Sequence, residues 1–194
     1  MTIVEDGTGN GYNAQVTKDN ELKTTGELRT IQHNTSRLAE NAYQIVGTST
    51  LSSGTITGLH IKNTSSTKIL VVTYIRHQIV GSSGGTSFPN TSNYLSIGLG
   101  RTYSSGGATA TAVNVNGGSV VTAEITAYQT VPTLAGTASE IDRWYTKADG
   151  DMNTFNKEGS LILQPNQTIE LSYVTDKSAG TLYTRLSFIM VDKP

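Results

Sequence analysis

Short runs of alternating apolar and polar residues, separated by turn-forming residues, constrain the fold of this chain more than any other feature. Alternation with a period of two is typical of β-strands, because successive side chains point to opposite faces of a sheet. The run from 68 to 80 has apolar residues on both faces, with Ile69, Val71, Thr73, Ile75 and Ile79 on one and Leu70, Val72, Tyr74 and Arg76 on the other. We therefore expect this strand to lie at the centre of a sheet or at an interface.

Further runs repeat the pattern. The run from Leu95 to Leu99 alternates with small residues, and a turn at 165–167 separates the run 161–163 from a strand that begins at Ile169. The last run, from Leu182 to Val191, is so apolar that we expect it inside the fold.

Two connections are also predicted. The sequence Asn116-Gly117-Gly118-Ser119 is a hairpin signal, because primed turns require positive φ at their central residues. We expect it to join a strand at 113–115 to a return strand at 121–127. The segment 132–157 interrupts the alternation and is predicted to be a long loop.

The fold class follows from the number and spacing of these runs. Eight or so short strands with no amphipathic helix between them argue against an α/β fold. We predict an all-β protein, an antiparallel β-sandwich of jelly-roll type. The length of 194 residues suits one such domain with an appendage.

The appendage is expected at the amino terminus. Ala14 and Val16 alternate with polar residues, turn formers follow at 18–21, and Leu22 resumes the alternation, which predicts a small hairpin. A short helix is also expected at 27–41, where Leu28, Ile31 and Leu38 partly fit one helical face. We therefore divide the chain into an extended arm, 1–41, and a sandwich domain, 42–194.

Composition excludes several classes of function. Because the chain has no cysteine, it has no disulfide, zinc-thiolate site or cysteine nucleophile. A formal net charge of −1 gives no general attraction to nucleic acid or to an anionic membrane. No apolar run has membrane-spanning length, and the first residues lack the features of a signal peptide, so we expect a soluble protein.

Two loops superficially resemble ligand sites. The cluster Gly7-Thr8-Gly9-Asn10-Gly11 lacks the lysine and hydroxyl residue that end a phosphate-binding loop, which favours a flexible or tightly turning arm. Asp149, Asp151 and Asn153 are spaced like the first ligands of a calcium loop, but the glycine and the later glutamate are misplaced. A solvated loop is favoured over a cation site.

Catalytic patterns are weak. The three histidines, His33, His60 and His77, do not have the close spacing of metal ligands, and His77 is expected to be half-buried and hydrogen-bonded. Glu140 and Asp142 could form a glycosidase pair, but such carboxylates usually lie on separate elements. We predict no enzyme activity, no metal and no cofactor.

Aromatic residues leave a binding function open. Trp144 and Tyr145 lie side by side in the predicted loop and could form an exposed aromatic contact, with Tyr103 as a further ring. Amphipathic rings serve at exposed binding sites, including those for sugars. A glycan-binding module is therefore the main alternative to a purely structural protein.

The amino-terminal segment carries a family resemblance. The stretch from Val4 to Val16, with its Asp-Gly-Thr-Gly and Ala-x-Val patterns, followed by Asn20-Glu21-Leu22-Lys23-Thr24, resembles the start of virion structural proteins of tailed bacteriophages. Looser similarity continues through Ala42-Tyr43-Gln44-Ile45 and the turn at Pro165. The chain departs from the pattern at Glu21, where a basic residue is expected, and at 141–156.

The resemblance implies a role in the virion. Such proteins are jelly-roll capsid decoration proteins or head accessory proteins, commonly homotrimers, and some belong to tails or fibres. It implies that this chain is assembled in the bacterial cytoplasm, binds itself and the major capsid protein or another virion protein, and stabilises the head. The arm residues that would dock on the capsid are Val4, Asp6, Gly7, Thr8, Gly9, Gly11, Tyr12, Ala14, Val16, Asn20 and Leu22.

Overall fold

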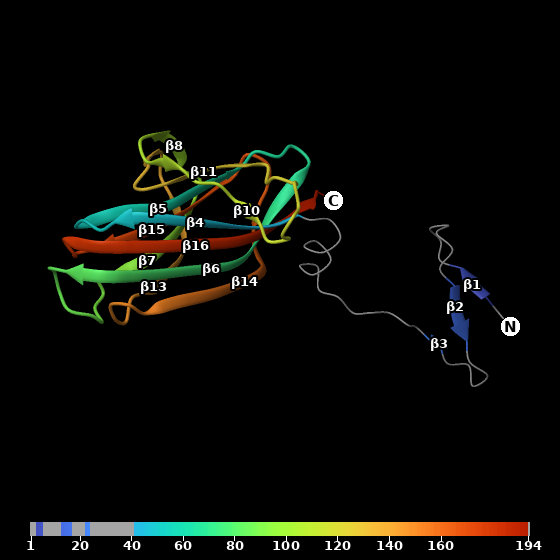
Figure 1. The fold of residues 1–194 in the computed structure, drawn as a ribbon, viewed down its shortest axis with the longest axis horizontal. Coiled ribbons are helices and arrows are strands. Elements are labelled where there is room, and N and C mark those ends of the chain that lie inside the picture. Colours follow the sequence, from blue (N-terminus) through green and yellow to red (C-terminus); the bar gives the residue numbers. More distant parts are fainter. Residues whose placement is uncertain (1–2, 6–12, 17–21, 24–40, 194) are drawn as a thin grey trace. The chain divides into compact units, whose positions relative to one another are not determined.

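The computed structural model describes residues 3–5, 13–16, 22–23 and 41–193, and the chain divides into two compact units, 1–31 and 32–194. The first unit contains β1 (Ile3–Glu5), β2 (Asn13–Val16) and β3 (Leu22–Lys23), which form an antiparallel sheet in that order (Figure 1). Val16 pairs with Leu22 in the register of the predicted hairpin. The helix predicted at 27–41 falls on residues of which only Asn41 is described, and Asn41 is in no helix.

The second unit is an antiparallel β-sandwich, as predicted. One sheet has five strands, in the order β10 (Val113–Asn114), β4 (Ala42–Thr50), β16 (Ala179–Asp192), β6 (Lys68–Ser83) and β14 (Met152–Leu163). The other has six, in the order β13 (Ser139–Tyr145), β7 (Tyr94–Leu99), β15 (Thr168–Thr175), β5 (Gly54–Asn63), β11 (Ile125–Gln129) and β9 (Ala108–Thr109). A separate pair is formed by β8 (Thr102–Ser105) and β12 (Thr133–Ala135).

The core lies between the two large sheets, where alternate residues of each strand point inward. Its largest fully buried side chains include Tyr43, Tyr173 and Phe188, and the rings of Tyr43 and Phe188 stack with centroids 5.4 Å apart. β16 lies between β4 and β6, so the apolar final run is inside the fold, as expected (Figure 1). The turn at 165–167 is also confirmed, with Gln167 N donating to Gln164 O at 3.0 Å.

The predicted alternation of the run 68–80 is right on each side of Val72 and Thr73 but wrong across them. Ser187 pairs with Tyr74, but the next residue, Phe188, pairs with Val72, so Thr73 is an extra residue in β6. This β-bulge reverses the alternation. Leu70 and Val72 point into the core before the bulge, and Ile75 and Ile79 do so after it, while Ile69 and Val71 face outward.

The predicted loop at 132–157 is also wrong, because it contains β12, β13 and the start of β14. β13 and β14 pair with β7 and β6 and form the outer edges of the two sheets. No residue of β13 is fully buried, so neither face of this edge strand requires an apolar stripe, and the periodic signal in its sequence is weak. The short turn between them is fixed by Gly150 N, which donates to Ile79 O at 2.7 Å.

The predicted hairpin around 116–119 forms a turn but no paired strands. Ser119 N donates to Asn116 O at 3.1 Å. However, Val113 pairs with Gln44 in one sheet, whereas Ile125 pairs with Asn63 in the other. The chain therefore crosses between the sheets here, because each strand makes its ladder with a distant partner.

Candidate interaction surface

The outward side of the five-stranded sheet carries a polar and aromatic surface that we call the arginine face. Cross-strand register places Arg185 beside Val46 on one side and Arg76 on the other, and Tyr183 beside Gln78. Met152 on β14 pairs with Gln78 on β6. Its residues are Gln44, Val46, Tyr74, Arg76, Gln78, Met152, Tyr183, Arg185 and Ser187.

Two arginines face each other at the centre of this surface. Arg76 Nε and Nη2 donate hydrogen bonds to the hydroxyl of Tyr74 at 3.0 and 2.8 Å. Hydrogen bonds from Thr154 and Arg76 hold the pKa of Tyr74 below its usual value. Arg185 Nε is buried without a hydrogen-bond partner, and neither arginine forms an ion pair within the described part of the chain.

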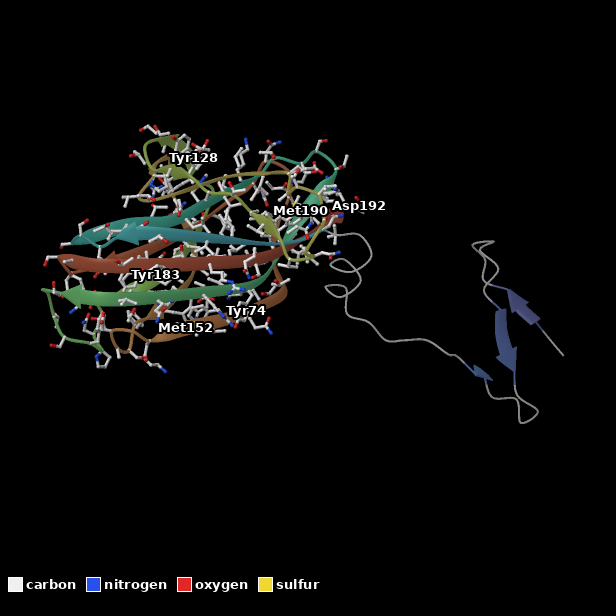
Figure 2. The ribbon with its side chains drawn as sticks, in the orientation of Figure 1. Tyr74, Tyr128, Met152, Tyr183, Met190 and Asp192 are labelled. Atoms are coloured by element: carbon white, nitrogen blue, oxygen red, sulfur yellow. The ribbon has the colours of Figure 1, made fainter. Side chains whose placement is uncertain are left out.

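The arginine face is hollowed on both sides of Arg185. A hollow of about 400 Å³ is lined by Gln44, Tyr74, Ser187 and Arg185 among others. A second hollow of about 210 Å³ is lined by Val46, Arg76, Gln78, Met152, Tyr183 and Arg185. Figure 2 shows Tyr74, Met152 and Tyr183 on β6, β14 and β16. Because Val46, Met152 and Tyr183 are about half exposed, at 51, 59 and 43%, the surface is open to a ligand.

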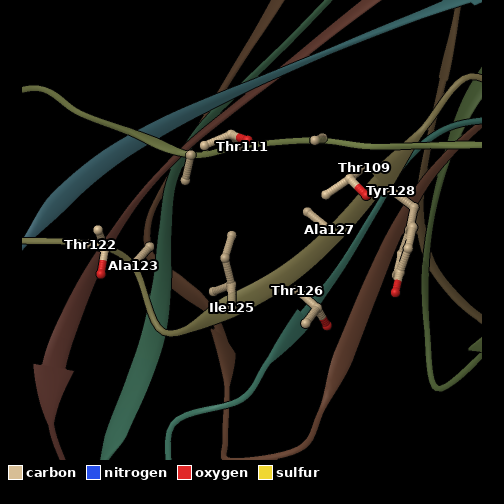
Figure 3. A pocket seen from close by; sticks show the side chains of 10 residues that line it. Thr109, Thr111, Thr122, Ala123, Ile125, Thr126, Ala127 and Tyr128 are labelled. Atoms are coloured by element: carbon tan, nitrogen blue, oxygen red, sulfur yellow. The ribbon is translucent and has the colours of Figure 1, made fainter.

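A third hollow, of about 270 Å³, lies beside β9 and β11. Figure 3 shows its lining, which consists of threonines and alanines with Ile125 and Tyr128. With no acid, histidine or basic residue in that lining, it offers hydroxyl groups and apolar contact but no charge to hold an ionic ligand.

The predicted aromatic contact divides into two different environments. Trp144 is partly buried against the core, where its ring stacks on Phe155 at 3.7 Å and Lys157 Nζ lies over it at 4.6 Å. Tyr145 is 46% exposed and meets Tyr94 edge to face. The indole therefore has packing partners already, and only Tyr145 of this pair presents a large exposed area.

We expect Trp144→Ala to lower the free energy of unfolding by about 3 kcal/mol, because it removes the contacts with Phe155 and the core. Tyr145→Ala is the matched control, and its greater exposure limits the loss to about 1 kcal/mol. Urea denaturation measures both values. Equal losses for the two variants would contradict the structural role of Trp144.

The carboxylates considered for catalysis are held in ion pairs. Glu140 Oε1 lies 2.8 Å from Arg143 Nη2, and Asp142 Oδ2 lies 2.6 Å from Lys157 Nζ. Asp149 accepts hydrogen bonds from the backbone of Gly81 and Ser82. Within the described residues, no group of three histidine or acidic side chains is arranged to hold a metal.

A buried polar cluster was missed in the sequence. Glu170 lies on β15 beside His60 and Gly98, and its Oε1 lies 3.4 Å from Arg101 Nη1. Arg101 Nη2 donates to Leu134 O at 3.0 Å, which ties β12 to the six-stranded sheet. Burial raises the pKa of Glu170 and lowers that of His60. The sequence feature that could have indicated this cluster is a glutamate, Glu170, between the apolar residues Ile169 and Leu171 of a strand.

His60 and His77 are both buried, and the environment of His77 differs from the one expected. Its side chain is 1% exposed, its ring stacks on Phe155 at 5.7 Å, and neither ring nitrogen has a hydrogen-bond partner in the described structure. His60 is equally buried, and its Nε2 lies 3.1 Å from Arg101 O. His77 is therefore fully buried instead of half-buried, and its expected hydrogen bond is absent from the described residues.

The predicted docking residues of the arm lie in the first unit. Val4 is in β1, Ala14 and Val16 are in β2, and Leu22 is in β3. The others, Asp6, Gly7, Thr8, Gly9, Gly11, Tyr12 and Asn20, lie outside the described residues.

Among the described residues there is no helix long and apolar enough to cross a membrane.

Neither the family models nor the curated proteins compared with this chain give a match.

Proposed function

We propose that this protein is a structural component of a tailed-phage virion, a decoration protein that docks on the capsid through its arm, 1–41. The resemblance of the segment from Val4 to Thr24 to phage virion proteins supports this proposal. In this role the sandwich projects from the capsid, and the buried interface stabilises the assembled head by mass action.

A jelly-roll topology is part of the proposal. Eight strands, four in each sheet, make up this topology. In the five-stranded sheet, β4, β16, β6 and β14 are consecutive neighbours, and in the six-stranded sheet β5, β15, β7 and β13 are consecutive neighbours. Successive strands of this set change sheets at every step except from β7 to β13. This winding agrees with a double-sheet jelly roll of eight strands.

The observation that carries the assembly proposal is a group of exposed valines at one edge of the five-stranded sheet. Val113, Val120 and Val121 are 66, 92 and 36% exposed, and the first lies in the edge strand β10. Val115 is 52% exposed but lines the larger hollow of the arginine face, so it is left outside this edge. Exposed apolar patches mark interaction sites, and a closed cyclic oligomer buries them economically. We infer a homotrimer that uses this edge. The apolar side chains of Leu70 and Val72 on β6, by contrast, are already buried inside the sandwich.

The test is a deletion of residues 1–26. We expect the full-length and shortened proteins both to sediment as trimers at micromolar concentration and to unfold at nearly the same temperature, because the valine edge and the core belong to the second unit. Only the full-length protein should join particles assembled without a native copy of this chain. Particle occupancy is measured by gel densitometry.

Three results would count against the proposal. Full occupancy by the shortened protein contradicts docking through the arm. Failure of the shortened protein to fold contradicts an arm that is independent of the core. A full-length protein that sediments only as a monomer contradicts the trimer.

A further inference from the structure

The paired arginines of the arginine face differ from the other arginines in the described part of the chain. Two other arginines of the sandwich have acidic partners, since Arg101 lies 3.4 Å from Glu170 and Arg143 lies 2.8 Å from Glu140. Arg76 and Arg185 instead lie directly opposite each other on β6 and β16. Like charges at such positions destabilise a sheet, and local departures of this kind occur at functional sites.

The groups around the two arginines favour the binding of an anion. Tyr74 holds Arg76 through two hydrogen bonds, which reduces the conformational freedom that binding must remove. The remaining N–H groups of the planar guanidinium match the oxygens of a carboxylate or a sulfate. Within the described lining of both hollows there is no acidic side chain that would compete.

The neighbouring groups favour a ligand rich in hydroxyls. Gln44 and Ser187 are hydrogen-bonded to each other at 3.3 Å and keep further donors and acceptors, and Gln78 lies in the adjoining hollow. Tyr183 offers a half-exposed ring. Protein partners are usually anchored by a large side chain in a dry pocket, whereas the larger hollow is lined by polar and apolar groups in equal measure. The smaller hollow has a mainly apolar lining, in which Arg76, Gln78 and Arg185 supply the polar groups.

We propose that the arginine face binds an acidic oligosaccharide, with Arg76 and Arg185 on its anionic groups and the two adjoining hollows holding successive sugar units. This binding is independent of the arm. It would give the virion protein a surface for anionic glycans of a cell envelope or of the medium around it.

The experiment is calorimetric titration of the full-length protein with trigalacturonate, which carries carboxylates, and with a sulfated trisaccharide. Maltotriose is the neutral probe. We expect binding of at least one acidic probe, weakened by raising NaCl from about 0.05 to 0.5 M, and no binding of maltotriose. The two acidic probes distinguish carboxylate from sulfate as the preferred group.

Variants connect this binding to the site. Arg76→Gln and Arg185→Gln should each weaken it by about tenfold or more, because each removes a charge-assisted contact. Arg185→Lys keeps the charge but loses the planar fork, so it should also weaken binding. Arg143→Gln is the matched control on the other sheet and should bind like the parent. Arg185→Gln should melt no lower than the parent, because a like-charge contact is relieved and its Nε has no hydrogen bond to lose.

Several results would overturn the inference. These are equal binding of maltotriose, an equal loss in Arg143→Gln, and no heat with either acidic probe at millimolar concentration. Tighter binding of a tetraglutamate peptide than of both acidic sugars would assign the surface to an acidic protein instead. Because these variants retain the arm, they should still join particles, so failure here leaves the decoration role separately testable.

Discussion

Replacing Gly47 with valine is expected to lower the free energy of unfolding by about 3 kcal/mol or more, or to prevent folding. Gly47 lies on β4 and is buried where this strand passes close to β5. A Cβ atom at this position would lie 2.5 Å from the carbonyl oxygen of Gly58 and 2.8 Å from Thr184 Oγ1. A backbone oxygen cannot move aside without displacing its strand, so the two sheets would have to separate locally.

Gly117→Val is the matched control. A Cβ atom there meets nothing within 4 Å, so the variant should change the free energy of unfolding by less than about 1 kcal/mol. Urea denaturation followed by circular dichroism gives both values. An unchanged midpoint for Gly47→Val would show that β4 and β5 are farther apart than the structure places them.

The second large effect is a loss of stability in acid caused by His77. Burial lowers the pKa of His77 from 6.5 to about 4. In the unfolded chain His77 therefore becomes protonated near pH 6.5, whereas in the folded protein it becomes protonated only near pH 4. The contribution to stability is complete above pH 6.5 and is lost as the pH falls to 4, by a total of about 3 kcal/mol.

His77→Leu and His77→Gln remove the titrating ring and test this contribution. We expect the difference in unfolding free energy between parent and variant to change by about 3 kcal/mol from pH 7 to pH 4 in the same direction for both. Subtraction cancels the contribution of Glu170, whose raised pKa favours the folded state in acid, and that of His60, whose lowered pKa acts in the same direction as that of His77. A difference that stays constant with pH would contradict the burial of a neutral His77.

Local sequence was sufficient to predict the strands with strong alternation. The run ending at Val191 and the turn at 165–167 were identified correctly, because an apolar stripe and turn chemistry act over a few residues. The same signal established the β-sandwich. It failed for β13 and β14, since edge strands with polar outer faces resemble loops in sequence.

What the sequence by itself determined is the all-β class, the turns and the burial of the most apolar strands, because these depend on neighbours along the chain. The tertiary structure decided which strands pair and which face each residue takes. The bulge at Thr73 reverses the faces of β6, and only the register with β16 brings Arg76 opposite Arg185. Both depend on hydrogen bonds between residues more than a hundred positions apart, a separation that no local pattern encodes.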